Sequence, residues 1–421
     1  MKNHESRNFN IAMLSIHSNP IGVLGTIDTG GMSVYISELA REIGSRGHRV
    51  DIYTRRHDGG HRPVIELSKN VRLIYLSIAN TGNLSKLTLY PHLHKFFQSM
   101  EKFRTDENLA YEIIHSHYWL SGRLGTWAQN YWNRPHLVTF HTLGELKNRT
   151  GVGTPEPEIR ITNEKELIKT CHRVLAPTER ERDNLIRFYD APEEKIGVVP
   201  CGVNLELFRP EGREVARKRL GFKPDDIILL YVGRFDPLKG LDILLEAMAY
   251  LNNSNRFRLV IVGGDGKKNP GYQYLRQKTH DLDISEKCLF AGHIEQKRLP
   301  SYYNSADVLV IPSRYESFGL VGLESLACGR PVVSTPVGAM EELLREARTG
   351  RVITRISPQS LARGIQSLIA DRSLPLAVEI RESVLEYSWS SVADAIIKEY
   401  QVAVDQQAIG NDFLVSMEAS G

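Results

Sequence analysis

Two glutamates, Glu316 and Glu324, stand with seven residues between them in the stretch RYESFGLVGLESLACGRPVVST (314–335), and apart from Ser317 those seven are small or apolar. Residues 320–329 are apolar on every side, which is typical of a buried helix. Glu316 then lies in the loop before this helix, where unpaired backbone N–H groups favour an anion. A buried carboxylate without a partner is costly. Both acids are therefore predicted to face a hydroxyl-rich ligand, such as a sugar ring and a ribose; the alternatives are a helix cap and a structural ion pair.

Two cations occupy a second loop of this kind, in YVGRFDPLKG (231–240), which closes a predicted strand and opens a predicted helix. Arg234 offers a planar fork of donors and Lys239 a compact charge. Together they could hold a diphosphate and stabilise negative charge that develops on it. Solvated surface charges are the alternative interpretation of this pair.

Paired glycines follow the first predicted strand in GTIDTGGMSVY (25–35). Gly30 and Gly31 would let the backbone of a helix N-terminus approach an anionic ligand closely. The spacing is not GxGxxG, so a dinucleotide site is not indicated. A second glycine-rich strand exit, VGGDGKKN (262–269) with Gly264, is explained almost as well by a simple turn.

Three histidines, His115, His117 and His141, stand near the ends of two predicted strands, in HSHYW (115–119) and FHT (140–142). They lack the acid or cysteine spacing of a zinc site. We therefore expect no metal, and we expect His117 to act as a hydrogen-bonding residue in a cleft.

The elements that must position these residues are short β-branched runs alternating with helical patterns, which indicate parallel sheets covered on both faces. A first series of strands is expected at 10–18, 50–54, 111–117, 136–142, 173–178 and 195–200. A second is expected at 226–233, 258–264, 288–293, 307–313, 330–335 and 350–353. The prediction is an α/β protein of two doubly wound, Rossmann-like domains, whose ligand binds in the cleft between them. Their expected bounds are 1–205 and 206–385. They are followed at 386–421 by a C-terminal helix, expected over 389–404 and returning to the N-terminal domain, and by a frayed tail.

Composition narrows the class of protein. The 421 residues carry a net charge of +3, too small and too scattered for a nucleic-acid-binding face. Four cysteines without a CxxC pair, a polar N-terminus and no long apolar run favour a cytoplasmic protein. Whether it forms a homodimer is left open.

The motifs taken together resemble those of the retaining GT-B glycosyltransferases of family four. The resemblance rests on the two spaced glutamates, GRFDPLKG, GGM and VPCGVNLELFRP, and it covers about residues 10 to 405. It implies a GT-B fold and transfer of a sugar from a nucleotide-sugar, with UDP expected as the nucleotide. It also implies front-face displacement, in which a donor phosphate oxygen takes the proton of the acceptor, without a cofactor or a divalent cation.

The resemblance also assigns roles to residues. It implies a catalytic set of Glu316, Arg234, Lys239 and His117. Arg234 and Lys239 would bind the donor diphosphate, Glu316 the transferred sugar and Glu324 the ribose, while Gly30 and Gly31 approach the phosphates through backbone. The donor-binding set is completed by Gly264, Ile294, Phe318, Gly319 and Leu320. The phosphate of a small acceptor would be held by Lys86, expected in a loop, and by Tyr118, Thr142 and Arg160.

Within the family, the enzymes that glycosylate an inositol phosphate are the most similar, followed by the sucrose-phosphate synthases. Met32 favours the first branch, whereas Ser33 replaces an expected Asn. Two other functions stay open: a transferase for a lipid-linked or polysaccharide acceptor, and a non-catalytic sugar-nucleotide-binding protein. The lipid alternative needs an amphipathic helix on the membrane, for which residues 90–104 are the candidate; a core-packed helix is favoured there.

Overall fold

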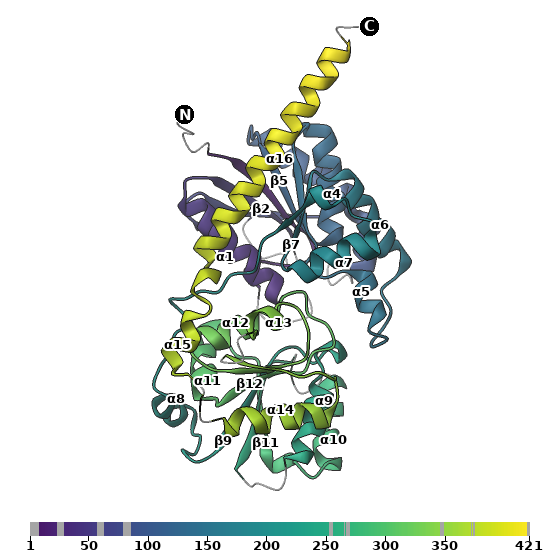
Figure 1. The fold of residues 1–421 in the computed structure, drawn as a ribbon. Coiled ribbons are helices and arrows are strands. Elements are labelled where there is room, and N and C mark those ends of the chain that lie inside the picture. The colour runs from purple at the N-terminus through teal and green to yellow at the C-terminus, as the bar shows by residue number, and fades with distance from the viewer. Residues whose placement is uncertain are drawn as a thin grey trace.

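The computed structural model consists of two lobes, each built around a sheet with helices on both faces (Figure 1). The residues that it describes are 8–22, 29–56, 63–78, 86–251, 256–264, 266, 270–345, 349–371, 373 and 375–418, with side chains described as far as residue 408. Residues 25–28, 265 and 267–269 of the two glycine-rich stretches lie outside this part. The predicted α/β architecture of two doubly wound domains is confirmed.

The N-terminal lobe holds an eight-stranded sheet in the order β3-β4-β2-β1-β5-β6-β7-β8. Its strands are β1 (Asn10–Ser15), β2 (Arg49–Arg55), β3 (Val64–Ser68), β4 (Val71–Leu76), β5 (Ile113–His117), β6 (His136–Thr139), β7 (Arg173–Ala176) and β8 (Ile196–Val198). All neighbours pair in parallel except β3, which is antiparallel to β4 at the sheet edge. The hairpin formed by β3 and β4 was not predicted from the sequence.

Helices cover both faces of this sheet and begin where strands end. They are α1 (Gly31–Ser45), α2 (Lys86–Leu89), α3 (Leu93–Asp106), α4 (Tyr118–Trp132), α5 (Gly144–Arg149), α6 (Glu158–Thr170) and α7 (Glu179–Tyr189). Three apolar residues of α3, Leu93, Phe96 and Met100, are buried in the core, and Phe97 and Phe103 pack against it while partly exposed. Residues 93–104 therefore form a core-packed helix, as the sequence favoured.

The C-terminal lobe holds a six-stranded parallel sheet in the order β11-β10-β9-β12-β13-β14. Its strands are β9 (Ile227–Val232), β10 (Phe257–Val262), β11 (Cys288–Gly292), β12 (Val308–Ile311), β13 (Val332–Ser334) and β14 (Gly350–Val352). Its helices are α8 (Arg213–Leu220), α9 (Leu241–Tyr250), α10 (Pro270–Asp281), α11 (Leu299–Ser305), α12 (Leu320–Ala327), α13 (Met340–Leu343), α14 (Pro358–Ala370) and α15 (Ala377–Glu382), with a short 3-10 turn η3 (Pro237–Lys239) after β9.

The chain crosses between the lobes twice, after β8 and again before α16 (Trp389–Glu418). The two crossing segments lie side by side, because the Val203 N–H donates to the Tyr387 carbonyl at 2.8 Å. Helix α16 then returns over the N-terminal lobe, where Trp389 and Tyr400 are buried and the helix packs against α1 (Figure 1). It continues to Glu418, past residue 404, where the predicted helix ends.

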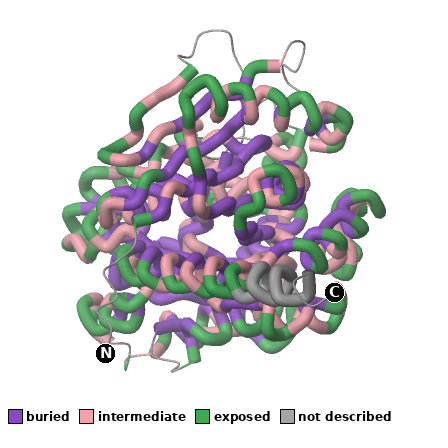
Figure 2. Tube along the Cα trace, turned by 90° about the horizontal axis from the view of Figure 1, so that it is seen from above, coloured by how far each residue is buried: buried purple, intermediate pink, exposed green. Residues whose placement is uncertain are grey.

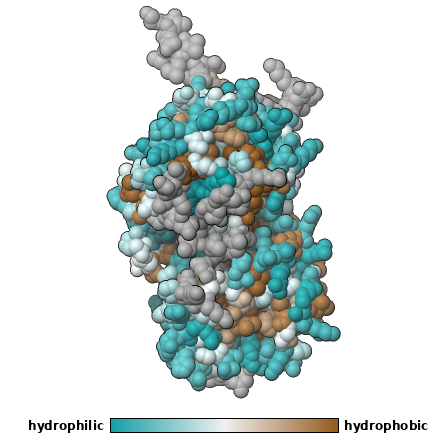
Figure 3. All heavy atoms as spheres, turned by 180° about the vertical axis from the view of Figure 1, so that it is seen from behind, coloured by the Kyte–Doolittle hydropathy of each residue, from teal (hydrophilic) through white to brown (hydrophobic). Residues whose placement is uncertain are grey.

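Seen from above, buried residues lie in the middle of the trace and exposed residues lie mainly toward its outside (Figure 2). On the face seen in Figure 3, hydrophilic side chains cover both lobes and hydrophobic ones form separate patches. Within the part of the chain that the structure describes, no helix has both the length and the hydropathy needed to cross a membrane.

Candidate active site

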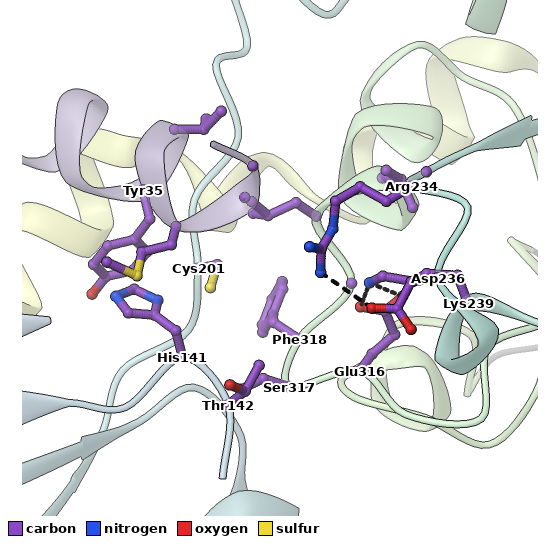
Figure 4. Close-up of a pocket in the computed structure, with 18 of the residues that line it drawn as sticks. Tyr35, His141, Thr142, Cys201, Arg234, Asp236, Lys239, Glu316, Ser317 and Phe318 are labelled. Carbon is purple, nitrogen blue, oxygen red and sulfur yellow. Dashed lines mark hydrogen bonds and ion pairs between the residues drawn. The ribbon is translucent and has the colours of Figure 1, made fainter. Parts of the chain in front are cut away.

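A cavity of about 380 Å³ lies between the lobes, at the carboxyl ends of strands from both sheets. Its walls come from the segments after β1, β5, β6, β7 and β8 on one side, and from the loops after β9, β10, β11 and β12 on the other. Parallel sheets of this type bind ligands at that edge. The cavity is therefore the candidate active site (Figure 4).

At the C-terminal side of the cavity, Lys239 and Glu316 form an ion pair in which Lys239 Nζ is 2.7 Å from both carboxylate oxygens (Figure 4). The Ser313 hydroxyl donates a further hydrogen bond to Glu316 Oε1 at 2.8 Å. Arg234 is held less firmly, since its Nη2 lies 3.6 Å from Asp236 Oδ2 and its side chain is 41% exposed. These groups give the cavity two cations and a fixed carboxylate in one place.

The turn that carries Lys239 fits only because Gly240 follows it. Gly240 has φ of +66°, and a Cβ built there would stand 2.0 Å from the Pro312 carbonyl oxygen. The Lys239 turn and the exit of β12 can thus approach each other, which brings Lys239 to Glu316.

Two helix N-termini also face the cavity. Helix α1 starts after Gly30 and α12 after Gly319, and among the residues that the structure describes neither has a side-chain cap or an acid in its first turn. Their first N–H groups and the positive ends of their dipoles are therefore available to an anion. A Cβ built on Gly31 would be 3.2 Å from Leu320 Cδ1, so the two helix starts approach each other from opposite lobes.

Glu324 lies one turn into α12 and is 8% exposed at the cavity wall. The Tyr303 hydroxyl donates to Glu324 Oε2 at 2.5 Å. Burial raises the pKa of the Glu324 carboxyl to about 7, although the hydrogen bond from Tyr303 opposes the rise. One carboxylate oxygen is thus fixed by the protein while the residue borders the cavity, as expected of a group that binds a ligand hydroxyl.

At the N-terminal side, the Tyr118 ring is the centre of a basic cluster. Lys86 Nζ lies 5.5 Å and Arg160 Cζ 4.8 Å from the ring centroid, and the His17 ring is 4.3 Å away. Burial lowers the pKa of His17 well below its usual range, and the positive charges of Lys86, Arg160 and Arg55 lower it further. Arg160 is paired with Glu156 at 2.9 Å and with Glu164 at 2.7 Å, so Lys86 is the cation of this cluster that faces the cavity and can meet an anionic group of a ligand.

Arg160 belongs to this cluster but does not line the cavity, because its side chain is only 1% exposed. Its Nη2 donates to the carbonyl (2.6 Å) and hydroxyl (3.0 Å) oxygens of Thr142, and its Nε donates to Glu164 Oε1 at 2.7 Å. Arg160 therefore supports Thr142 from behind. Lys86 begins the short helix α2, which corrects the expectation that it lies in a loop.

His117 likewise lies behind the wall rather than in it. It is fully buried, and its Nδ1 is 2.9 Å from Nε2 of His141, which does line the cavity. His141 has φ of +61°, and burial lowers its pKa to about 3, so both imidazoles are neutral. His141 stands where the sequence analysis placed His117.

Most of the expected site residues are thus brought together. The cavity is lined by Gly30, Gly31, Lys86, Tyr118, Thr142, Arg234, Lys239, Ile294, Glu316, Phe318, Gly319, Leu320 and Glu324. Gly264 is not among them; a Cβ there would meet the Phe235 ring at 2.3 Å, and its neighbour Gly263 lines the cavity instead.

Sequence reasoning missed the lining residues His17, Tyr35, Lys147, Tyr315 and Ser317. His17 had a signal, since it is a polar residue at the end of the first predicted strand (10–18). No group of three or more His, Cys, Asp or Glu residues suited to a metal ion occurs among the described residues.

Two family profiles match the chain in succession. "Glycosyltransferase Family 4" matches residues 29–207, and "Glycosyl transferases group 1" matches residues 212–386. The matches adjoin where the chain passes from the first lobe to the second.

Individual relatives match over nearly the whole chain. A D-inositol 3-phosphate glycosyltransferase of Geodermatophilus obscurus is 35% identical over 94% of this chain and 90% of its own length. Another, of Streptomyces bingchenggensis, is 37% identical over 94% of this chain and 89% of its own length. Among solved structures, the sucrose-phosphate synthase of Thermosynechococcus elongatus superimposes with a TM-score of 0.86 at 30% identity, covering 94% of this chain and 98% of that one.

Proposed function

The chain belongs to family 4 of the GT-B glycosyltransferases, and from that premise we propose that it moves a hexose from a UDP-sugar to a small phosphorylated acceptor with retention of anomeric configuration. An inositol phosphate or a hexose phosphate is the acceptor that we propose. The observation that carries the proposal is the division of the cavity into two anion-binding ends with Glu316 near one of them.

The donor end is formed by Arg234, Lys239 and the uncapped starts of α1 and α12. These groups suit a diphosphate, whose negative charge grows as the sugar leaves. Preorganised donors and cations aimed at that charge stabilise the transition state. In this proposal Glu316, which contacts Ser313 and Lys239, orients a sugar hydroxyl, and Glu324, which contacts Tyr303, accepts from a ribose.

The acceptor end is the basic cluster around Tyr118. Lys86, Tyr118 and Thr142 line it, and Arg160 fixes Thr142. One cation, Lys86, and the hydroxyls of Tyr118 and Thr142 are thus the groups that the cavity offers to a phosphate here. Two relatives are named as D-inositol 3-phosphate glycosyltransferases and one solved structure as a sucrose-phosphate synthase. These names support a phosphorylated acceptor for this chain as well.

In the reaction that we propose, the bond between the anomeric carbon and the diphosphate oxygen breaks. The acceptor hydroxyl oxygen attacks that carbon from the same face, and its proton passes to the departing phosphate oxygen. The protein contributes positioning and charge, and the proposal includes no cofactor or divalent cation. The four cysteines are buried free thiols, which supports a reducing compartment, and we place the enzyme in the cytoplasm.

The apolar residues of α3, on which the lipid-linked alternative depends, are used for core packing. That packing favours the small-acceptor proposal over a membrane-bound transferase.

The test is an assay of nucleoside diphosphate release with purified protein, UDP-, ADP- and GDP-sugars, and matched acceptors. Inositol phosphate and fructose 6-phosphate are compared with inositol and fructose, and NMR gives the anomeric configuration of the product. We expect UDP release that depends on the phosphorylated acceptor.

Lys86→Met should raise the acceptor KM, by an amount equivalent to about 1.5–3 kcal/mol for the loss of one charged contact. Lys95→Met, at an exposed position of α3, is the matched control. Equal use of free and phosphorylated acceptors would contradict the acceptor class.

A further inference from the structure

Both chain neighbours of Glu316 are hydrogen-bonded to the opposite lobe. The Tyr315 hydroxyl accepts a hydrogen bond from the Leu143 N–H at 3.1 Å, and the Ser317 hydroxyl donates to Glu181 Oε2 at 2.5 Å. Leu143 directly follows Thr142 in the acceptor end of the cavity. The three-residue segment that carries Glu316 is therefore attached to the N-terminal lobe on both sides of that residue.

Glu181 is unusual for its place in α7. It stands three residues after the N-cap Thr178, whose hydroxyl accepts from the Glu181 N–H at 3.0 Å. At this position a glutamate side chain typically turns back to the N-cap backbone and completes a capping box. Here the recorded hydrogen bond of the carboxylate is the one to Ser317, in the other lobe. The side chain is almost fully buried, at 4% exposure.

Leaving a buried carboxylate there is costly unless a partner satisfies it. Burial is the main cause that raises the Glu181 pKa, with the charge of Glu164 adding to the rise and the Ser317 hydrogen bond opposing it. The donor that satisfies Glu181 is thus supplied by the opposite lobe. Separation of the lobes would break that contact.

We propose that Glu181 and Tyr315 are positioning residues, which tie the Glu316 segment to the N-terminal lobe and hold Glu316 in its productive place only while the lobes are closed. This inference rests on the proposed glycosyl transfer and adds which residues position Glu316 for it. Neither residue needs to touch a substrate: Glu181 acts through Ser317, and Tyr315 through the backbone that carries Glu316.

A neighbouring contact between the lobes provides a matched control. Arg180 pairs with Glu341 at 2.5 Å and donates to the Pro336 carbonyl at 2.7 Å, but both ionic side chains are about half exposed. Ion pairs this exposed contribute little. Arg180→Ala therefore removes a contact between the same two lobes without touching the Glu316 segment.

The first experiment measures UDP-sugar turnover and UDP affinity for Ser317→Ala, Glu181→Ala and the double variant. Each single variant should lose roughly tenfold in kcat, as for a charge-assisted hydrogen bond, with UDP affinity within about twofold of wild type. The double variant should lose no more than either single one, because both remove the same contact. Glu181→Gln, which can still accept from Ser317, should restore most of kcat, and Tyr315→Phe should also lower kcat. Unchanged kcat in the single variants, or additive losses in the double one, would overturn the proposal.

The second experiment does not depend on turnover. Dyes on Tyr131→Cys in the N-terminal lobe and Tyr274→Cys in the C-terminal lobe, both exposed positions, report the distance between the lobes by energy transfer. With UDP present, Ser317→Ala should show a longer mean distance than wild type and Arg180→Ala the same distance. Equal distances for Ser317→Ala and wild type would overturn the tie. A wild-type protein that transfers no sugar while these distances differ would instead reject the proposed function.

Discussion

At the scale of single residues, the centre of the site is the ion pair between Lys239 and Glu316. Lys239 contacts both oxygens of Glu316, so neither charge is left unpaired in the partly buried cavity. A bound diphosphate would compete with Glu316 for Lys239, which has three N–H donors to share. The carboxylate would then be free to turn toward a sugar hydroxyl.

The first prediction concerns Glu316→Gln. The amide keeps the size of the side chain but cannot form the ion pair or bind a sugar hydroxyl as a carboxylate does. We expect kcat to fall by the equivalent of about 2–4 kcal/mol, while UDP affinity and the circular dichroism spectrum stay close to wild type. Glu341→Gln, on the exposed rim, is the control. A Glu316→Gln protein with wild-type turnover would remove Glu316 from the mechanism.

The second prediction concerns charge at the leaving group. Arg234→Ala and Lys239→Ala should each slow transfer strongly, because each removes a cation facing the proposed diphosphate position. Treatment with EDTA should leave the wild-type rate unchanged, since the proposed chemistry uses side chains and helix N-termini. Activity that EDTA abolishes and added Mg²⁺ restores would assign the stabilisation of the leaving group to a metal ion.

The third prediction is a pH dependence of stability due to Glu324. Burial raises its pKa from 4.5 to about 7, so the fold favours the protonated carboxyl. That contribution is present in full below about pH 4.5 and is lost as the pH rises through about 7, to a total of about 3 kcal/mol. Glu324→Gln should therefore gain stability relative to wild type between pH 5 and pH 8 in denaturant titrations. Glu181, whose pKa is also raised, is present in both wild type and Glu324→Gln, so its own contribution to the pH dependence of stability cancels from the comparison. Parallel pH profiles would contradict the assignment.

Single residues were predictable where the sequence motif also fixed the local geometry. Glu316, Lys239 and Glu324 line the cavity as the motifs indicated, because each is set by a strand exit or a helix start. His117 and His141 could not be told apart in this way, because both lie near strand ends and a left-handed backbone at His141 decides which one reaches the cavity. The role of Glu181 depends on the opposite lobe, which no local pattern describes.

At the scale of elements, the site depends on two segments meeting at Gly240. The fourth prediction compares Gly240→Ala with Gly221→Ala. Both glycines have positive φ, +66° and +74°, but a Cβ at Gly240 meets Pro312 O at 2.0 Å, whereas nothing lies within 4 Å at Gly221. Gly221→Ala should cost about 1 kcal/mol of unfolding free energy for the backbone strain alone.

Gly240→Ala should lower the free energy of unfolding by more than Gly221→Ala does. It should also lower turnover, because the new methyl group pushes the Lys239 turn away from Glu316. Chemical denaturation of both variants and a kcat measurement separate the two effects. Equal costs for the two variants would mean that the close approach to Pro312 is unimportant.

The alternation of strands and helices was predictable for most of both lobes, because buried parallel strands read as continuous apolar runs. The hairpin of β3 and β4 was missed. Strand β3 is an edge strand with half-exposed residues, and the apolar run of β4 is interrupted by Arg72. Arg72 is placed there by an ion pair with Asp51 on β2, at 2.7 Å, a partner that the linear pattern does not reveal.

At the scale of the whole molecule, α16 packs against the N-terminal lobe although it follows the C-terminal lobe in the chain. The fifth prediction concerns Trp389, which is buried, packs edge-to-face on Tyr35 and fills the space above Gly202. Trp389→Ala should destabilise the protein by about 3–5 kcal/mol, as for other large cavities. Val402→Ala, on an exposed position of the same helix, should change stability little. A small loss for Trp389→Ala would mean that α16 is only loosely attached.

The paired crossings between the lobes set the kind of motion that the molecule can make. A single tether would leave one lobe free to swivel about it in any direction. Two strands of chain joined by the bond from Val203 to Tyr387 form a short ribbon, which bends easily across its flat face but resists twisting. We expect this pairing to favour opening and shutting of the lobes about one axis, so that each closure would return the Glu316 segment to the same register against Leu143 and Glu181.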